Sequence, residues 1–229
     1  GRPGNSPIDG TRADCEKPRP LTDGESEIWL AAQFGAEANA AMTEVVTLRI
    51  DGPLDAERLL TALRAVLGRH GALRSRFSPS GETVRVDPAG TVPVRSADLS
   101  CEVEPEAALA TELHGLAGLS FDPVAGPVAR ADLLRLGERR HVLVLSAHHI
   151  ACDGWSFAVL ADEIAHAYRA GLDQLAAVPQ VDGAVAPKAE ADRALRYWAD
   201  LYTRPPEPLD LPTDRARPKL RGFVGDTRS

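Results

Sequence analysis

The stretch from His141 to Ser156 constrains the fold of this chain more than any other part of the sequence. It opens with His-Val-Leu-Val-Leu-Ser-Ala, a run of β-branched and aliphatic residues that predicts a buried strand. Two histidines follow, and a short turn closes on Asp153-Gly154. A strand–loop–helix junction brings polar side chains to the edge of a sheet, so we expect the chemistry at the two histidines. The helix predicted after the turn has an apolar face formed by Trp155, Val159, Leu160, Ile164, Ala167 and Tyr168.

The two histidines, His148 and His149, are not expected to face the same way, because successive side chains of a strand alternate. We expect one to be packed and the other to be presented to a substrate, where an imidazole with its usual pKa of about 6.5 exchanges a proton at little cost. Asp153 either orients a histidine, as in a catalytic triad, or pairs with a distant arginine and holds the loop closed. Gly154 is expected to give the turn its backbone freedom. The alternative is that both histidines are only hydrogen-bonded polar residues at the end of a strand. We would favour that interpretation for a lone histidine, but not for this pattern.

The segment His148–Gly154 resembles the HHxxxDG motif of the condensation domains of nonribosomal peptide synthetases. The wider chloramphenicol-acetyltransferase-like acyltransferases share this motif. Two further segments support the resemblance. The run Arg69–Phe77 is similar to the family's RHExLRTxF motif, although Gly71 replaces the glutamate and Ser75 the threonine. Residues 209–218 resemble the segment that leads out of the family's first lobe.

Four residues are expected to support the active-site loop. Without the histidine motif, Arg69 and Arg74 would be interpreted as a solvated basic helix end, which the helix dipole favours. Beside the motif, Arg74 is a candidate salt-bridge partner of Asp153. Trp155 and Ser156 follow the motif directly, in an order that differs from the Ser-Trp of epimerising relatives. Heterocyclising relatives replace the first histidine by aspartate, so the sequence resembles the condensing group.

The remaining periodicities predict an α/β fold in which helices flank a mixed β-sheet, as in a chloramphenicol-acetyltransferase-like lobe. The last of the expected strands should lie inside the sheet and form a hairpin with the strand before it. We expect a disordered leader or linker at 1–19, the N-terminal lobe of a condensation domain at 20–208, and an exit segment towards a missing second lobe at 209–229. The expected strands are 45–50, 83–86, 92–94, 128–136 and 141–147, and the expected helices are 55–67, 105–117, 156–170 and 190–203.

The resemblance implies amide formation between two carrier-tethered substrates. The amine of a downstream aminoacyl thioester attacks an upstream acyl or peptidyl thioester, and both arrive on the phosphopantetheine arms of carrier proteins. The domain itself is expected to bind no cofactor and no metal. The catalytic motif is formed by His148, His149, Asp153 and Gly154. His149 is the residue expected to accept a proton from the amine, or to position the amine and stabilise the tetrahedral species.

A complete condensation domain has two lobes with the catalytic channel between them. This chain is therefore expected to be inactive alone, and to expose a face that recruits a partner or self-associates. Residues 25–33 look more like the subgroup found beside polyketide synthase modules. Two alternatives stay open. One is a stand-alone acyltransferase of the same superfamily that uses acyl-CoA or an acyl-carrier thioester, and the other is a non-catalytic carrier-binding fragment.

The charge and the cysteine content indicate which partners and which cellular compartment to expect. The net charge of −7, from 33 acidic and 26 basic residues, argues against a nucleic-acid partner. No apolar run approaches the roughly 20 residues of a membrane span, and the polar start shows no signal peptide. The odd number of cysteines (Cys15, Cys101 and Cys152), without metal-ligand spacing, favours a reduced, cytoplasmic setting. Cys152 lies inside the motif but is not expected to be a nucleophile, because the family needs no covalent enzyme intermediate.

Overall fold

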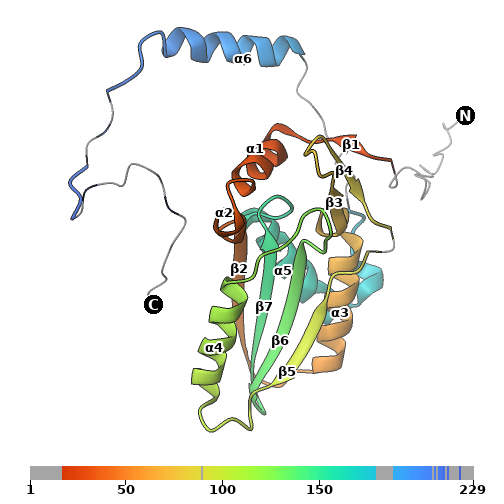
Figure 1. Cartoon of the computed structure of the whole chain (residues 1–229). Helices are drawn as coiled ribbons and strands as arrows, with labels where there is room; N and C mark the ends of the chain where they lie inside the picture. Colours follow the sequence, from red (N-terminus) through yellow and green to blue (C-terminus); the bar gives the residue numbers. More distant parts are fainter. Residues whose placement is uncertain are drawn as a thin grey trace, which may run out of the picture. The chain divides into compact units, whose positions relative to one another are not determined.

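The computed structural model describes residues 17–88, 90–178, 188–207, 209, 211–214, 216 and 222. The chain forms two compact units, residues 1–179 and 180–229. Most of the expected leader and much of the expected exit segment lie outside the described residues, and the predicted boundary at 208/209 stays a prediction. The elements of the first unit (Figure 1) are β1 (Arg19–Pro20), α1 (Asp23–Ala32), α2 (Ala36–Ala40), β2 (Thr43–Asp51), α3 (Ala56–Arg69), η2 (Gly71–Arg74), β3 (Ser75–Phe77), β4 (Thr83–Val86), β5 (Val94–Asp98), α4 (Pro105–Ala117), β6 (Ala129–Gly137), β7 (Arg140–His148), α5 (Gly154–Ala170) and η3 (Leu172–Gln174).

The main sheet is mixed, with the strand order β2-β7-β6-β5. Strand β7 pairs antiparallel with β2 on one side and with β6 on the other, and β5 runs parallel to β6. The α/β class, the hairpin of β6 and β7 and the interior position of 141–147 are therefore confirmed. The β2–β7 register runs from Thr43 opposite His148 to Asp51 opposite Arg140. The carboxyl end of β7 thus lies beside the start of β2.

Helices cover both faces of this sheet, as Figure 1 shows. On one face, Leu143, Leu145 and Ala147 of β7 belong to a core cluster shared with α3 and α5. On the other face, Val142 and Val144 pack with residues of α4. Because both faces are buried, the strand has a continuous apolar sequence rather than an alternating one. This is the physical reason why the run before the histidines is so strongly apolar.

A small sheet, with the order β1-β4-β3, packs beside helix α1. Its core is formed by Trp29, Phe77 and Val84, and the ring planes of Trp29 and Phe77 are stacked with centroids 6.3 Å apart. Ile150 completes this cluster from the loop that follows β7. The small sheet therefore anchors the loop that carries the histidines.

The predicted strand 92–94 is wrong in its position. The strand β5 covers Val94–Asp98, and Val92 is a buried core residue that precedes it. The sequence of β5, Val-Arg-Ser-Ala-Asp, is polar because the strand lies at the edge of the sheet and pairs only with β6 among the described strands. Apolar periodicity cannot reveal a strand of this kind.

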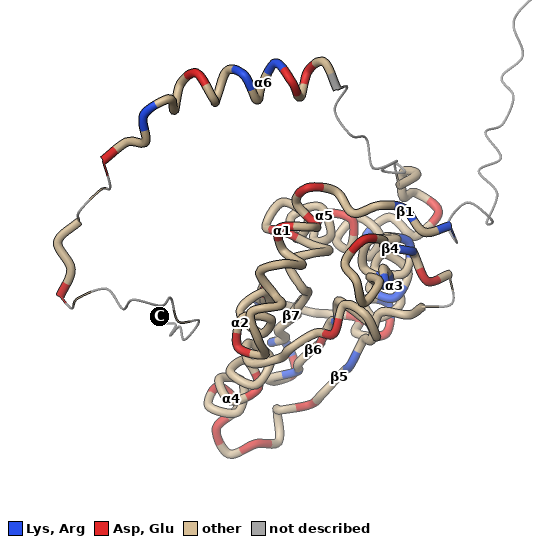
Figure 2. Tube along the Cα trace, turned by 45° about the horizontal axis from the view of Figure 1, so that its top comes forward, with Lys and Arg blue, Asp and Glu red and all other residues tan. Residues whose placement is uncertain are grey.

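In the second unit, helix α6 covers Lys188–Leu201, close to the predicted 190–203. Figure 2 shows acidic and basic residues distributed along it. The helix residues Tyr197 and Trp198 and the following Tyr202 are exposed and contact one another, with Trp198 stacked on Tyr202 and edge-on to Tyr197. Across the described part of the chain, none of the helices has the length and apolar character that a membrane crossing requires.

Candidate active site

The first histidine, His148, is packed. It continues the β7 side chains that face α4, and its ring is fully buried. The Ile150 N–H donates to its Nδ1 at 3.1 Å, so the ring proton is on Nε2, which donates to Asn39 Oδ1 at 3.1 Å. Burial, followed by the neighbouring His149, lowers the pKa of His148 to about 4. His148 is therefore a neutral structural group near neutral pH.

Asn39, which the sequence analysis missed, fixes the orientation of His148. The Asn39 side-chain nitrogen donates to Ser120 Oγ at 2.7 Å and to the carbonyl of Phe121 at 2.8 Å. These two acceptors turn the amide so that its oxygen faces the histidine. The network joins α2, the segment before β6 and the end of β7, three elements far apart in the sequence. No sequence motif marks Asn39 for this role.

The second histidine, His149, is presented to the outside. Its backbone N–H donates to the Met42 carbonyl at 2.7 Å, and its side chain is 37% exposed. Its Nδ1 lies 3.2 Å from the Cys152 carbonyl oxygen and 3.0 Å from Oε1 of Glu44. Both neighbours are acceptors, so the ring proton belongs on Nδ1 and the lone pair on Nε2. No hydrogen bond from the described residues reaches Nε2, which leaves this nitrogen available to take a proton from a ligand.

Asp153 makes neither of its predicted contacts, with a histidine or with Arg74, in the described part of the chain. Its Oδ1 accepts hydrogen bonds from the Ser156 hydroxyl at 2.6 Å and the Ser156 N–H at 2.8 Å, so it is the N-cap of α5. These hydrogen bonds hold the pKa of Asp153 below its ordinary value. Asp153 sets where α5 begins, and Ser156 is its partner.

The predicted ion pair between Arg74 and Asp153 is wrong. Arg74 donates from its guanidinium to the Asp87 carbonyl at 2.6 Å, and the Asp87 N–H donates back to the Arg74 carbonyl at 3.0 Å. Arg74 is the last residue of η2, and its guanidinium reaches the residue that follows β4. The described ion pairs do not include one between Arg74 and Asp153.

Arg69 and its neighbour His70 join the end of α3 to α5 through a residue that the sequence analysis missed. The Glu163 carboxylate lies 2.8 Å from His70 Nε2 and 3.6 Å from an Arg69 guanidinium nitrogen. Arg69 also donates to the Ala176 carbonyl. Arg69 therefore holds the helix that follows the histidine loop, rather than the loop itself.

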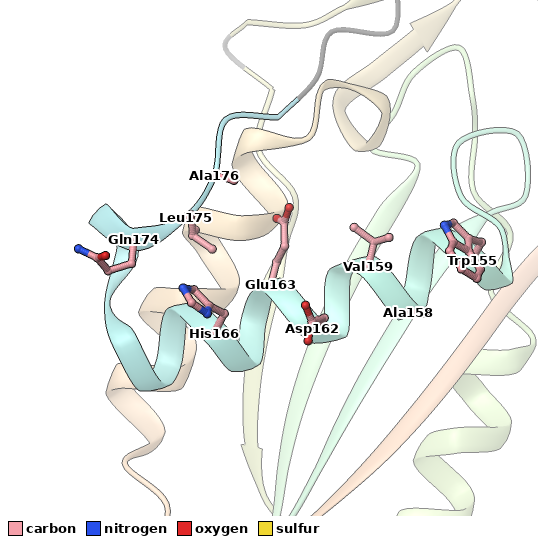
Figure 3. Close-up of a pocket in the computed structure, with 9 residues that line it drawn as sticks. All are labelled: Trp155, Ala158, Val159, Asp162, Glu163, His166, Gln174, Leu175 and Ala176. Atoms are coloured by element: carbon pink, nitrogen blue, oxygen red, sulfur yellow. The ribbon is translucent and has the colours of Figure 1, made fainter.

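Trp155 does not lie on the buried face of α5, contrary to the prediction. The apolar face of α5 begins at Phe157, whereas the Trp155 side chain is 80% exposed. Trp155 lines one end of a groove of about 540 Å³ along the outer side of α5, which Figure 3 shows extending to Gln174. His149 is not among the residues that line this groove. Gly154 does not have a left-handed φ, and a Cβ there would meet no atom within 4 Å, so its predicted backbone freedom is not used.

Cys152 contributes its backbone rather than its thiol. Burial, followed by the nearby Asp153 and Glu44 carboxylates, raises the thiol pKa to about 12. A thiol with such a pKa is protonated near neutral pH and is not a nucleophile. Within the described residues, no group of three or more His, Cys, Asp or Glu side chains is arranged to hold a metal ion.

Comparison with known proteins identifies relatives of this chain. The family profile described as "Condensation domain" matches residues 17–229. The chain is 31% identical over 230 residues to malpibaldin synthetase of Mortierella alpina, covering 93% of this chain and 4% of that protein. It is 32% identical over 222 residues to chondramide synthase cmdD of Chondromyces crocatus, covering 90% of this chain and 6% of that protein.

Solved structures agree with the sequence relatives. The first condensation domain of the calcium-dependent antibiotic synthetase, in complex with a substrate analogue, superposes with a TM-score of 0.68 at 30% identity. The superposition covers 84% of this chain and 50% of that domain's chain. The cyclization-docking bidomain of EpoB from Sorangium cellulosum gives a TM-score of 0.74 at 21% identity, which shows the shared fold alone. The chain thus spans about half of a solved condensation domain, and a small part of each curated relative.

Proposed function

The chain belongs to the condensation domain family, and from this membership we propose that it forms an amide bond between two carrier-tethered substrates. The amine nitrogen of the acceptor attacks the carbonyl carbon of the donor thioester. A C–N bond forms, the C–S bond breaks, and the proton lost by the amine balances the thiolate that leaves. The proposal assigns this proton to His149 Nε2 and from there to the sulfur.

The observation that carries the proposal is the state of the His149 ring. Its Nδ1 faces two acceptors, its side chain is part-exposed, and Nε2 has no partner among the described residues. A neutral imidazole with a free Nε2 lone pair is the group that a deprotonating step needs. His148 lacks this property because it is buried and both ring nitrogens are occupied.

The partners follow from the proposed reaction. Two carrier proteins would present their thioesters on phosphopantetheine arms, which are substrates rather than a cofactor bound by the domain. A second lobe would complete the channel, since the chain spans about half of a solved condensation domain. A cytoplasmic setting belongs to the same proposal, and the free thiols of Cys101 and Cys152 support it.

The test is dipeptide formation with loaded donor and acceptor carriers, measured by mass spectrometry. The chain joined to a second lobe should turn over, and His149→Ala should abolish turnover. His114→Ala, an exposed histidine on α4, is the matched control and should retain activity. Turnover that survives His149→Ala would refute the proposal.

The chain without a second lobe should not turn over. Orienting two reactants supplies up to roughly 7–11 kcal/mol of a barrier, and half a channel cannot align both thioesters. Turnover by the 229-residue chain alone, lost on His149→Ala, would show instead that the lobe is sufficient. Transfer from acyl-CoA, without any carrier, would favour a stand-alone acyltransferase.

A further inference from the structure

We propose that Glu44 is a positioning residue for His149. This inference rests on the proposed function, because it assigns a role to Glu44 through the histidine that would act in amide formation. Glu44 holds the His149 proton on Nδ1, and so keeps the Nε2 lone pair directed at the substrate. Its negative charge also stabilises the ring when Nε2 has taken a proton.

The pairing of β2 and β7 brings Glu44 to the histidine. Glu44 lies directly opposite Ala147, and His149 follows two residues later along the same chain. Residues two apart on a strand share a face, and diagonal cross-strand neighbours are within reach of long side chains. The backbone bond from His149 to the Met42 carbonyl continues the pairing beyond β7. The Glu44 carboxylate therefore reaches Nδ1 from the adjacent strand, at 3.0 Å.

The two oxygens near Nδ1 favour the tautomer that is protonated there. The Cys152 carbonyl accepts a hydrogen bond from Nδ1, and the Glu44 carboxylate lies within ion-pair distance of the same atom. A lone pair on Nδ1 would be repelled by both oxygens, so the proton stays there and Nε2 is the basic nitrogen. The carboxylate adds what the carbonyl cannot, which is a full negative charge to balance an imidazolium.

Asp153, the other acid near the ring, makes no hydrogen bond or ion pair with His149 in the described part of the chain. Its carboxylate is engaged by both donors of Ser156 at the start of α5. Arg74 does not neutralise Glu44 either, because it donates to the Asp87 carbonyl. The carboxylate that contacts the His149 ring in the described part of the chain is therefore that of Glu44.

Stability does not explain the pair. The side chains of Glu44 and His149 are each 37% exposed. Contacts between groups this exposed contribute little to folding, because water screens their charges. Replacing Glu44 should therefore leave the denaturant midpoint unchanged, and any effect on the reaction would arise at the histidine.

The first experiment measures the tautomer directly in the 229-residue chain, with no activity required. Nitrogen-15 NMR of labelled imidazoles distinguishes a protonated Nδ1 from a protonated Nε2. In the unchanged chain His149 should be protonated at Nδ1, and Glu44→Ala and Glu44→Gln should both increase the fraction protonated at Nε2. Glu138→Gln, in the exposed turn at the other end of the β6–β7 hairpin, is the matched control and should change nothing.

The second experiment measures amide formation by the chain joined to a second lobe. Glu44→Ala and Glu44→Gln should lower kcat about tenfold to a hundredfold, the usual loss when a partner that orients a metal-bound histidine is removed, and should leave KM unchanged. An unaltered tautomer or an unaltered kcat in both variants would overturn the inference. If His149→Ala abolishes turnover while the Glu44 variants are unaffected, the proposed function stands and this inference fails. If His149→Ala is without effect, the proposed function itself fails.

Discussion

Acidification should destabilise this protein through His148. The ring is fully buried, its Nδ1 accepts the Ile150 N–H, and burial lowers its pKa from 6.5 to about 4. Protonation would place two N–H donors face to face, so the folded state resists it. The unfolded chain has no such constraint and binds the proton near the ordinary pKa.

The sign and the size of this effect follow from linkage. Between pH 6.5 and pH 4 the unfolded state binds more protons than the folded state, so the free energy of unfolding falls as the pH falls. Above pH 7 the His148 side chain is neutral in both states, so its protonation does not lower the free energy of unfolding. Each pKa unit is worth about 1.4 kcal/mol, so the loss is about 2.5 kcal/mol at pH 4.5 and about 3.4 kcal/mol once both states are protonated.

The assay is urea unfolding between pH 7 and pH 4.5, for the chain and for His148→Gln. His141 is also buried with a lowered pKa and contributes in the same direction, so the difference between the two proteins isolates His148. That difference in unfolding free energy should shrink by about 2.4 kcal/mol over this range. As a measurement that needs no variant, an NMR titration should show His148 neutral at pH 5. A fully protonated ring in the folded protein at pH 5 would refute the reasoning.

Three further outcomes are expected. Asp153→Ala should lower the free energy of unfolding by about 1 kcal/mol, because the N-cap of α5 is lost. In a double-mutant cycle this effect should add to that of Arg74→Ala within about 0.5 kcal/mol. A larger coupling energy would support the predicted ion pair between the two residues. Iodoacetamide near pH 8 should alkylate exposed Cys101 and spare Cys152 in the folded chain, as peptide mass spectrometry would show; rapid labelling of Cys152 would contradict its raised pKa of about 12. Leu63→Ala, in the fully buried centre of α3, should cost about 2–5 kcal/mol in urea unfolding, and an unchanged midpoint would contradict the packing described.

Much of the fold could be predicted from apolar periodicity. The interior strand, its hairpin partner and the helices α3 and α5 are each defined by buried side chains that recur at a fixed spacing. The edge strand β5 could not be placed this way, because only Val94 and Ala97 of its five residues are apolar and they do not follow a period of two. A strand of this kind forms through backbone hydrogen bonds to the neighbouring strand, and the local sequence pattern does not show these bonds.

The candidate site was predicted in part. Alternation along a strand implies that one of the two adjacent histidines is buried and the other presented, and His148 and His149 follow this rule. Their partners could not be predicted, because Asn39 and Glu44 reach the histidines through tertiary contacts. The partner assigned to Arg74 was wrong for a related reason: a motif shows which residues occur together, but not which carbonyl or carboxylate lies within reach.

The strand that precedes the histidines also limits how the gene for this protein can change. Each residue of β7 points to the face opposite its neighbour, so a single codon lost or gained between 141 and 147 would rotate everything beyond it by half a turn. The buried histidine, which now contacts α2, would be exchanged with the part-exposed one, although both would still be histidines. Loss of two codons would shorten the strand but leave each histidine on the face of the sheet that it occupies now. Relatives in which this strand differs in length are therefore expected to differ by an even number of residues. The constraint applies to the number of residues in the strand and not to their chemical type.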